Sequence, residues 1–400
     1  MVFGRYDYAS FLAFIAYSAG ATVVPVCLVI LAQELHFDLE KGGMTAGGAL
    51  HLGRTIPMVA AMLLCGFWAG RWGKRRTLGA SLLLMSVGMA LCALAPSYIF
   101  LFIAILIAGI GEGVLEGLAT PFVQDLHPEE PGRYINFSHA FWSIGVVGTV
   151  LLSGAFLARG VSWRLVIGVV SLLSLIPAAI LFLPTRHENA YPEHPETLHW
   201  RTIWNHAKTI LQIRRFWLFF AAMFVAGGGE FCLTFWCASY IQLHFSSSAW
   251  VGGVGTAYFA VGMVLGRTCS GYLLTQKHLR GLIVVSALAG TIITLLLPLT
   301  THINLLFLLL FLSGIATAPF WPSVQSYCAD RLPQGDTTML FILLACAGVP
   351  GCGVATWLMG YIGNQNGGLT RAFYLVPACY LILALLIGYD WMFPGKRQEK

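Results

Sequence analysis

The sequence predicts an all-α membrane protein whose twelve transmembrane helices form two pseudo-symmetric six-helix halves. Of the 400 residues, 58% are hydrophobic and only 10% are charged, and the mean hydropathy is +0.76. A soluble domain usually carries about 25% charged residues. Roughly twelve apolar runs are long enough to cross the hydrocarbon core, which takes about 20 residues each. In a bilayer the backbone must satisfy its own hydrogen bonds, so these runs must be helices.

The helices are expected at the apolar runs, in chain order. Those of the first half are residues 8–31, 45–70, 77–95, 98–124, 134–158 and 162–183. Those of the second half are residues 214–243, 249–275, 281–299, 303–328, 337–362 and 370–393. The first run is too long for a signal-peptide core, so we expect it to be retained as a helix.

The longest hydrophilic stretch lies between the two sets and contains Pro192, Pro195 and charges of both signs. We therefore assign residues 1–183 to an N-terminal half, 184–213 to a cytoplasmic linker and 214–400 to a C-terminal half.

Basic residues near the helix ends predict the orientation, because cytoplasmic loops carry an excess of lysine and arginine. One side holds Arg71, Lys74, Arg75, Arg76, Arg186, Arg201, Lys208, Arg214, Arg215, Lys396, Arg397 and Lys400. The other side holds only Lys41, Arg159, Arg164 and Arg371. Both termini and the linker are thus expected in the cytoplasm of a multi-pass protein of the cell (inner) membrane. The net charge of +6 reflects this bias and does not indicate nucleic-acid binding.

Short echoes relate the two halves. The matches are Leu35-His36-Phe37 with Leu243-His244-Phe245, Gly109-Ile110 with Gly314-Ile315, Asp125 with Asp330, and Gly145 and Gly148 with Gly348 and Gly351. Together they indicate two parallel repeats related by an axis along the membrane normal, the arrangement of major facilitator transporters.

Five ionisable residues are expected within the membrane, where such residues are functional candidates by default. They are Arg54, Glu112, Glu116, Glu230 and Arg267. Glu112 and Glu116 are four residues apart, so they lie on one helix face about one turn from each other. Two carboxylates this close in a low dielectric cannot both stay ionised cheaply, and at least one is expected to hold a proton. We predict that Glu116, Glu112 and Glu230 take part in proton coupling.

Each of these charges also has a structural interpretation. A glutamate can pair with an arginine and so hold the fold together. Arg54 is expected either to bind a substrate hydroxyl or to neutralise a glutamate of the fourth helix, whereas Arg267 is expected to link helices.

Polar and aromatic residues complete the predicted substrate site. Asn136 and His139 lie on nearby faces of the fifth helix, and Gln325 lies on the tenth. Tyr17, Trp142, Trp236 and Trp321 are candidates for stacking on a sugar ring. The alternative for each aromatic residue is packing between helices or anchoring at the membrane interface.

The residues around Glu116 resemble a known family. Gly113-Val114-Leu115-Glu116-Gly117-Leu118-Ala119-Thr120-Pro121-Phe122-Val123 is similar to the helix-4 motif G-x-L-E-x-x-x-N-P-F-V of fucose permease-like transporters. Asn136-Phe137-Ser138-His139-Ala140-Phe141 resembles their N-L-x-Q-x-F, and Gly266-Arg267 and Glu230 with Trp236 and Tyr240 resemble further family patterns. The resemblance implies import of a monosaccharide, with Glu116 as the carboxylate that links protonation to sugar binding.

The sequence also departs from that family. Thr120 replaces an asparagine, His139 a glutamine and Trp142 an asparagine, and the acidic residue of the first helix has no counterpart. The general loop motif of major facilitators is partial: Arg71 and Arg75 are present as gating candidates, but Gly70 replaces the usual aspartate.

These observations predict a monomeric secondary active transporter that imports a hexose or deoxyhexose, coupled to protons or, as the alternative, to sodium. We expect no cofactor and no metal. A proton-coupled exporter of cationic or amphiphilic compounds is the main alternative function. The sequence has no G-x-S-x-G elbow and no HExxH motif, so an enzyme is not expected.

Overall fold

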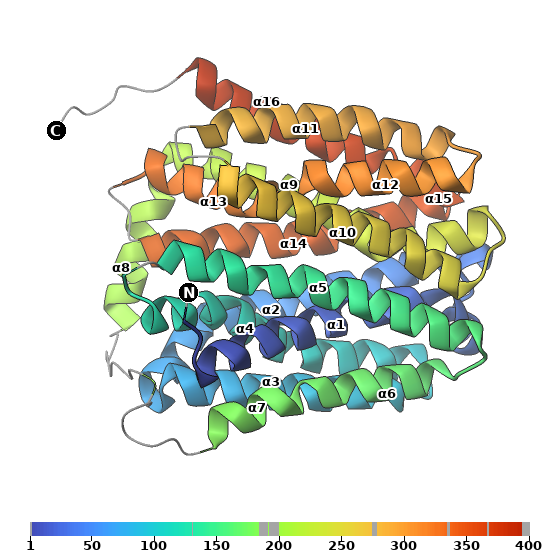
Figure 1. The fold of residues 1–400 in the computed structure, drawn as a ribbon, viewed down its shortest axis with the longest axis horizontal. Helices are drawn as coiled ribbons and strands as arrows, with labels where there is room; N and C mark the ends of the chain where they lie inside the picture. Colours follow the sequence, from blue (N-terminus) through green and yellow to red (C-terminus); the bar gives the residue numbers. More distant parts are fainter. Residues whose placement is uncertain are drawn as a thin grey trace.

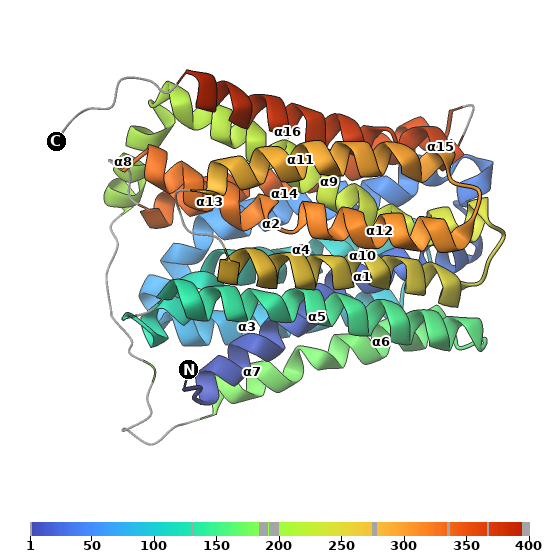
Figure 2. The same cartoon turned by 45° about the horizontal axis from the view of Figure 1, so that its top comes forward.

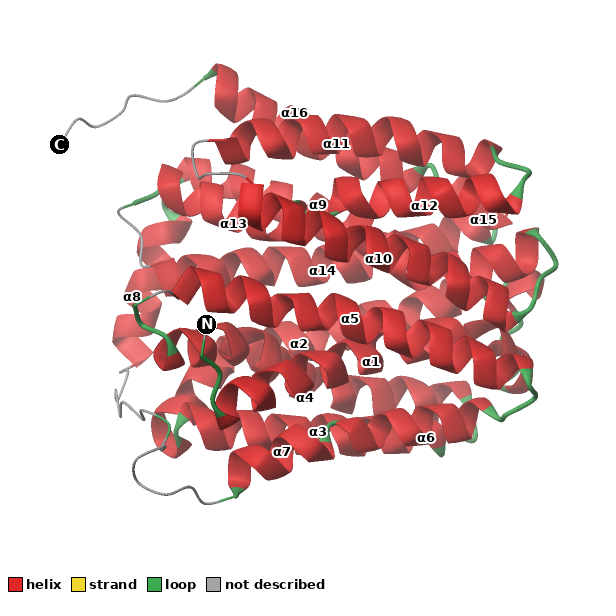
Figure 3. Ribbon diagram, viewed as in Figure 1, coloured by secondary structure: helices red, strands yellow, loops and turns green. Residues whose placement is uncertain are grey.

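The computed structural model describes residues 2–129, 131–183, 191, 200–273, 278–333, 337–365 and 368–393. Within these ranges the regular structure is entirely helical (Figure 3). Twelve helical spans among the described residues are long and apolar enough to cross a membrane. The predicted all-α fold class is therefore confirmed.

Each predicted apolar run is helical, with ends that differ by a few residues. The first six spans are α1 (Arg5–Glu34), α2 (Met44–Trp72), α3 (Lys74–Ala93), α4 (Tyr98–Leu126), α5 (Pro131–Ala158), and α6 (Trp163–Leu173) with α7 (Leu175–Phe182). The second six are α9 (Arg214–His244), α10 (Ala249–Leu273), α11 (Leu279–Leu296) with η4 (Leu297–Leu299), α12 (Ile303–Thr317) with α13 (Phe320–Arg331), α14 (Thr337–Gly363), and α15 (Gly368–Ala372) with α16 (Leu375–Met392). A short 3-10 helix, η1 (Leu39–Lys41), precedes α2.

Three spans that the sequence predicts as single helices are interrupted shortly before a proline. Proline has no N–H, so the carbonyl four residues earlier loses its helical partner. Pro177, Pro322 and Pro377 in this way remove the α-helical partner of the carbonyls of Leu173, Ala318 and Phe373, which lie at the three breaks. The Phe373 carbonyl accepts from the Val376 N–H at 3.1 Å instead. Pro25, Pro57, Pro121 and Pro350 leave α1, α2, α4 and α14 continuous, so a proline permits a break without forcing it.

The predicted linker contains a helix that the sequence analysis missed. α8 (Trp200–Leu211) packs against α9 and α14. Its buried side chains, Ala207 and Ile210, lie three residues apart, whereas Lys208 and Thr209 between them are exposed. A short amphipathic helix of this kind has too few apolar residues to stand out in a search for membrane spans. The division into halves at residues 184–213 stays a prediction.

The helices form two groups that pack along two seams. α1–α7 lie together, as do α9–α16, with α3, α6 and α7 at one flank and α11 and α16 at the other (Figures 1 and 2). Between the groups, α2 packs along α14 and α5 packs along α10. Between these two seams lies a space that side chains of both helix groups can line.

Glycines set the closest approaches within each group. A Cβ at Gly109 of α4 would lie 2.6 Å from the Arg54 carbonyl on α2. A Cβ at Gly314 of α12 would lie 2.1 Å from the Phe259 carbonyl on α10. Only residues without a side chain let backbones approach so closely. The matching glycines, Gly109 and Gly314, thus lie at the equivalent helix contact in the two groups.

The start of α1, the end of α16 and all of α8 lie at one end of the bundle (Figure 1). We call this the terminal end and the opposite end the far end. The sequence predicts that the terminal end is cytoplasmic.

Candidate functional site

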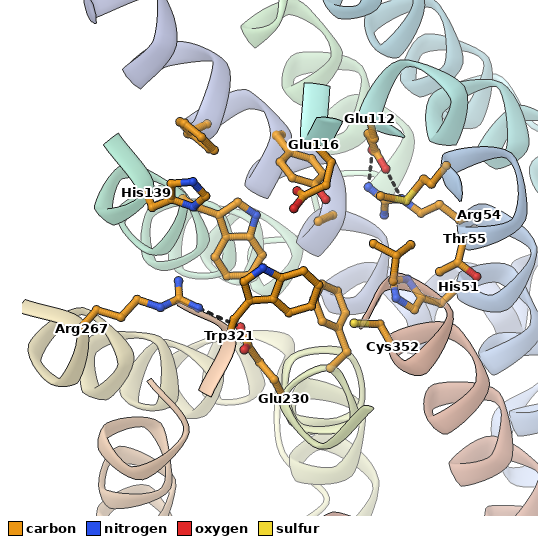
Figure 4. Close-up of a pocket in the computed structure, with 17 residues that line it drawn as sticks. His51, Arg54, Thr55, Glu112, Glu116, His139, Glu230, Arg267, Trp321 and Cys352 are labelled. Atoms are coloured by element: carbon orange, nitrogen blue, oxygen red, sulfur yellow. Dashed lines mark hydrogen bonds and ion pairs between the residues drawn. The ribbon is translucent and has the colours of Figure 1, made fainter. Parts of the chain in front are cut away.

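A cavity lies between the two helix groups near the middle of the spans, and we call it the central cavity (Figure 4). About 80 Å³ of it can be occupied by the centres of water molecules, which is room for several waters. Its walls come from α1, α2, α4 and α5 on one side and α9, α10, α13 and α14 on the other. The lining residues are Phe14, Tyr17, Ala21, His51, Arg54, Thr55, Met58, Glu112, Glu116, His139, Trp142, Glu230, Phe231, Arg267, Trp321, Val349 and Cys352.

All five predicted intramembrane charges line this cavity, and four of them form two ion pairs (Figure 4). In the first pair, Arg54 of α2 donates through Nε and Nη2 to both carboxylate oxygens of Glu112 on α4. Arg54 Nη1 also donates to the Gly20 carbonyl of α1 at 3.3 Å. The Arg54 side chain is 7% exposed and that of Glu112 is 0% exposed. Both oxygens of the Glu112 carboxylate accept from Arg54, and both side chains are buried. With the bond to Gly20, the pair ties α1, α2 and α4 together.

The second pair joins Arg267 of α10 to Glu230 of α9, with 3.2 Å between Nη2 and Oε1. Arg267 Nη1 donates to the Ser143 hydroxyl of α5 at 3.1 Å. Its Nε lies 3.4 Å from the Ala318 carbonyl, which Pro322 leaves without a helical partner. The guanidinium also lies 5.8 Å from the centroid of the Trp142 ring. Arg267 therefore contacts helices of both groups, and the interhelical link expected for it is present.

Glu116 differs from the other two acids. Among the described residues no lysine, arginine or histidine lies within ion-pair distance of its carboxylate. Its polar neighbour is Tyr17 of α1, which lines the same cavity. The side chain is only partly buried and lines two cavities at once.

The second cavity, which we call the terminal cavity, extends from Glu116 towards the terminal end. About 100 Å³ of it can be occupied by the centres of water molecules. It shares Glu116, His139 and Trp321 with the central cavity. Gln325 lines it, and so do Gln124 and Thr337, which are exposed near the terminal ends of α4 and α14. Glu116 thus lies where the central cavity meets a second cavity of mixed polar and apolar lining that extends towards the terminal end.

His139 lies at the same junction and makes a side-chain hydrogen bond. Its Nε2 lies 3.0 Å from the hydroxyl of Thr120, one helical turn after Glu116 on α4. Its ring packs 4.7 Å from that of Phe14. Asn136 belongs to α5, but its side chain lies outside the part of the chain that the structure describes.

At the far end the two groups meet closely, in a contact that we call the far-end seam: residues 42–55 with residues 353–364. A Cβ at Gly48 would lie 2.8 Å from the Thr356 carbonyl, and one at Gly360 would lie 2.3 Å from the Met44 carbonyl. Asn364 closes the edge, since its amide nitrogen donates to the Gly42 carbonyl at 2.7 Å. The central cavity is therefore covered on the far side.

Three predicted site residues lie away from both cavities. Trp236 is fully buried, donates to the Thr356 carbonyl at 2.9 Å and packs against Gly47, so it fills the far-end seam. Arg71 is exposed at the terminal end of α2, and Arg75 donates to the Leu181 carbonyl near the end of α7. The packing interpretation fits Trp236, because its indole is buried against Gly47 and Gly360 of the seam.

The sequence analysis overlooked His51, which lines the central cavity and is 5% exposed. A histidine within a membrane span was the signal that could have identified it. The described residues contain no group of three or more histidine, cysteine, aspartate or glutamate side chains arranged to hold a metal ion.

Comparison with known proteins places this architecture in context. The profile of the Major Facilitator Superfamily matches residues 9–303 and 253–400. The uncharacterized MFS-type transporter YybF of Bacillus subtilis (strain 168) is 25% identical over 179 residues, which are 44% of this chain and 44% of that protein. A multidrug resistance protein B homolog of Mycobacterium tuberculosis (strain ATCC 25618 / H37Rv) is 29% identical over 163 residues, 40% of this chain and 30% of that protein. The chain thus matches less than half the length of these curated relatives.

Among solved structures, the fucose:proton symporter FucP of E. coli aligns over 96% of this chain and 99% of its own, with a TM-score of 0.64 and 18% identity. At this identity the likeness shows the fold alone.

Proposed function

This chain belongs to the Major Facilitator Superfamily, and we propose that it is a secondary active transporter that carries a monosaccharide together with a proton. It is an integral membrane transporter by family and by its twelve apolar spans. The proton, the sugar and the direction of transport are the proposal.

The observation that carries the proposal is the difference between Glu116 and the other two cavity acids. Glu112 and Glu230 are each neutralised by an arginine. An unpaired carboxylate in a mostly apolar, low-dielectric cavity is costly to ionise, so it favours binding a proton. Glu116 has no such arginine among the described residues and lines the terminal cavity, which has room for water. It is therefore the acid best suited to load and release a proton during each cycle, with sodium as the alternative ion.

Alternating access follows from the two ends of the molecule. The far-end seam is closed, whereas the terminal cavity leads away from Glu116 towards exposed side chains. If the terminal end is cytoplasmic, as the basic residues predict, this conformation faces inward. A second conformation with an open far-end seam and a closed terminal cavity would expose the same site to the other side.

The chemistry of the lining supports a sugar. Trp142 and Trp321 present indole rings to the central cavity, and Gln325 presents an amide to the terminal cavity. Aromatic faces suit the apolar face of a pyranose, while amides and hydroxyls suit its hydroxyl groups. The resemblance of the helix-4 segment to fucose permease-like transporters favours a hexose or deoxyhexose. We expect a monomer to suffice, because one chain contributes every residue of the site.

One observation favours a second candidate function, export of organic cations. Trp142, Trp321 and Tyr17 surround a carboxylate that has no cationic partner among the described residues. Aromatic faces beside a negative charge bind quaternary ammonium groups. One curated relative is named as a multidrug resistance protein B homolog.

Transport into liposomes separates these candidates. The purified protein would be reconstituted and given labelled hexoses and deoxyhexoses, or cationic dyes, under an inward proton gradient, an inward sodium gradient or none. The proposal predicts that at least one sugar accumulates only under the proton gradient. If no sugar is taken up under any gradient, and cationic dyes are transported in exchange for protons, the sugar assignment is wrong and the exporter is favoured.

The matched variants are Glu116→Gln and Glu230→Gln, which remove the same charge from unpaired and paired positions. Glu116→Gln is expected to abolish accumulation while sugar exchange continues, because a neutral amide imitates the protonated acid. If Glu116→Gln still accumulates sugar to the wild-type level, Glu116 is not the coupling group.

A further inference from the structure

His51 lies at the inner edge of the far-end seam and bridges the two helix groups. It belongs to α2, and its ring stacks on Phe231 of α9 with 4.9 Å between centroids and 15° between planes. Phe235, one turn further along α9, lies 5.6 Å away. The imidazole therefore reaches from a helix of the first group onto a helix of the second, at a contact that must separate when the far end opens.

One nitrogen of this imidazole has no partner. Nε2 is buried, and none of the described residues forms a hydrogen bond with it. A buried polar atom without a partner costs about 1–3 kcal/mol. The hydroxyl of Thr356, on the opposite wall of the same seam, is also buried and has no hydrogen-bond partner among the described residues. In the closed seam these two groups therefore lack hydrogen bonds, which water would supply once the seam opened.

The surroundings tolerate a neutral imidazole but not a charged one. An imidazolium carries two N–H donors and a positive charge, which need acceptors or water. The charged group that acts on His51 is Arg54, three residues later on α2, and it has the same sign. Two of the three acids that line the cavity are already paired, Glu112 with Arg54 and Glu230 with Arg267, and among the described residues no ion pair joins Glu116 to His51. The remaining titratable groups of the cavity wall are Tyr17 of α1, His139 of α5 and Cys352 of α14, none of which is an acid that could pair with an imidazolium.

We propose that His51 is a proton-linked gate residue: it is neutral while the far-end seam is closed and takes a proton when the open seam admits water. The proton comes from water on the far side and returns there before the seam closes, so His51 transfers none across the membrane. This inference rests on the alternating access proposed above, but not on the identity of the substrate. It assigns His51 a role in the conformational equilibrium that is separate from the coupling role of Glu116.

The sign of the pH effect follows from linkage. The open state binds a proton on His51 at low pH and the closed state does not, so acid favours the open state. A hydrated imidazole titrates near pH ~6.5. The ratio of open to closed seam should therefore rise about tenfold between pH ~8 and pH ~5.5, and should change little above pH ~7.5.

Spin-label distance measurements across the seam test this. Labels would be placed at Glu40 and Gln365, exposed far-end positions of the two groups, after the exposed Cys269 is replaced by serine. Distance distributions would be recorded in lipid nanodiscs from pH 5.5 to pH 8. The wild type should gain a longer distance as the pH falls, with the tenfold change in ratio given above.

Three variants identify the group responsible. His51→Phe keeps the ring stack and His51→Gln keeps a polar side chain, and both should make the distance distribution independent of pH. His139→Gln removes the other cavity histidine, whose Nε2 already has a partner in Thr120, and should retain the wild-type response.

An unchanged pH response in both His51 variants would overturn the proposal while leaving the transport function intact. A wild-type seam that stays closed at every pH, with sugar present or absent, would overturn both this proposal and alternating access at this site.

Discussion

The two arginine–glutamate pairs of the central cavity use the same chemistry in different surroundings. Arg54 and Glu112 are 7% and 0% exposed, and their contacts stay within α1, α2 and α4. Arg267 and Glu230 are 18% and 6% exposed, and Arg267 also reaches Ser143 on α5, in the other helix group. Both pairs lie within one helix group, but Arg267 also bonds across to the other group, at a contact that the proposed alternating access would change. We infer that the first pair holds the fold and that the second responds to the transport cycle.

The largest expected effect is on stability, from breaking the enclosed pair. Glu112→Ala leaves the Arg54 guanidinium buried without its counter-ion, which should lower the free energy of unfolding by about 3–5 kcal/mol. Thermal unfolding can be followed with a thiol-reactive dye, because nine of the ten cysteines are buried or partly buried in the fold.

The matched comparison for that experiment is Glu230→Ala. Arg267 keeps Ser143 and the Ala318 carbonyl and has more access to water, so this variant should lose clearly less stability than Glu112→Ala. Equal losses would contradict the distinction between a fixed and a responsive pair.

The next largest effect is expected on the rate of transport, when Arg267 of the second pair is replaced by lysine. Arg267→Lys keeps the charge but cannot serve Glu230, Ser143 and the Ala318 carbonyl together, because an ammonium lacks the fork of a guanidinium. Sugar exchange between the two sides of a liposome should slow by about tenfold or more, which corresponds to a loss of about 1.4 kcal/mol. The melting temperature should stay close to that of the wild type. A large loss of stability with normal exchange would mean that this pair too is structural.

The smallest effect is expected at the junction of the two cavities. Thr120→Val removes the hydroxyl that lies 3.0 Å from His139 Nε2, at a cost of about 1 kcal/mol because water of the terminal cavity can replace it. Accumulation of sugar should persist at a modestly reduced rate. Complete loss of proton coupling in this variant would show that the hydroxyl belongs to the coupling machinery.

Much of the fold follows from the sequence, because a bilayer leaves a spanning segment no alternative to a helix. The twelve spans could be read from apolar length alone, and the glycine echo of Gly109 and Gly314 from the need for close helix contacts. The breaks at Ser174 and Ala318 could not, since Pro57 and Pro121 lie in continuous helices. The amphipathic α8 was missed because its apolar residues are too few to register as a span.

The charges of the site could be predicted, but their pairing only in part: Arg54 was expected either to bind a substrate hydroxyl or to neutralise a glutamate of the fourth helix, and the sequence did not say which glutamate. Their predicted positions within the membrane made Glu112, Glu116 and Glu230 candidates alike. Only the structure shows that Glu112 and Glu230 are paired with arginines, whereas Glu116 has no such partner among the described residues. Both glutamates line the cavity, but Glu112, one helical turn before Glu116, lies beside Arg54 and pairs with it. Trp236 was predicted at the substrate, but helix rotation directs it into the far-end seam. His51 was overlooked because its role depends on its contacts with Phe231 and Phe235 of the other helix group, which the sequence does not reveal.

The central claim is that the unpaired Glu116 couples sugar movement to a proton. The most direct test is the number of protons that enter a liposome with each sugar molecule, measured with a pH-sensitive dye inside liposomes and labelled sugar outside. We predict a fixed ratio in the wild type and in Glu230→Gln, and sugar movement without proton movement in Glu116→Gln. Proton movement that persists with sugar in Glu116→Gln would contradict the account.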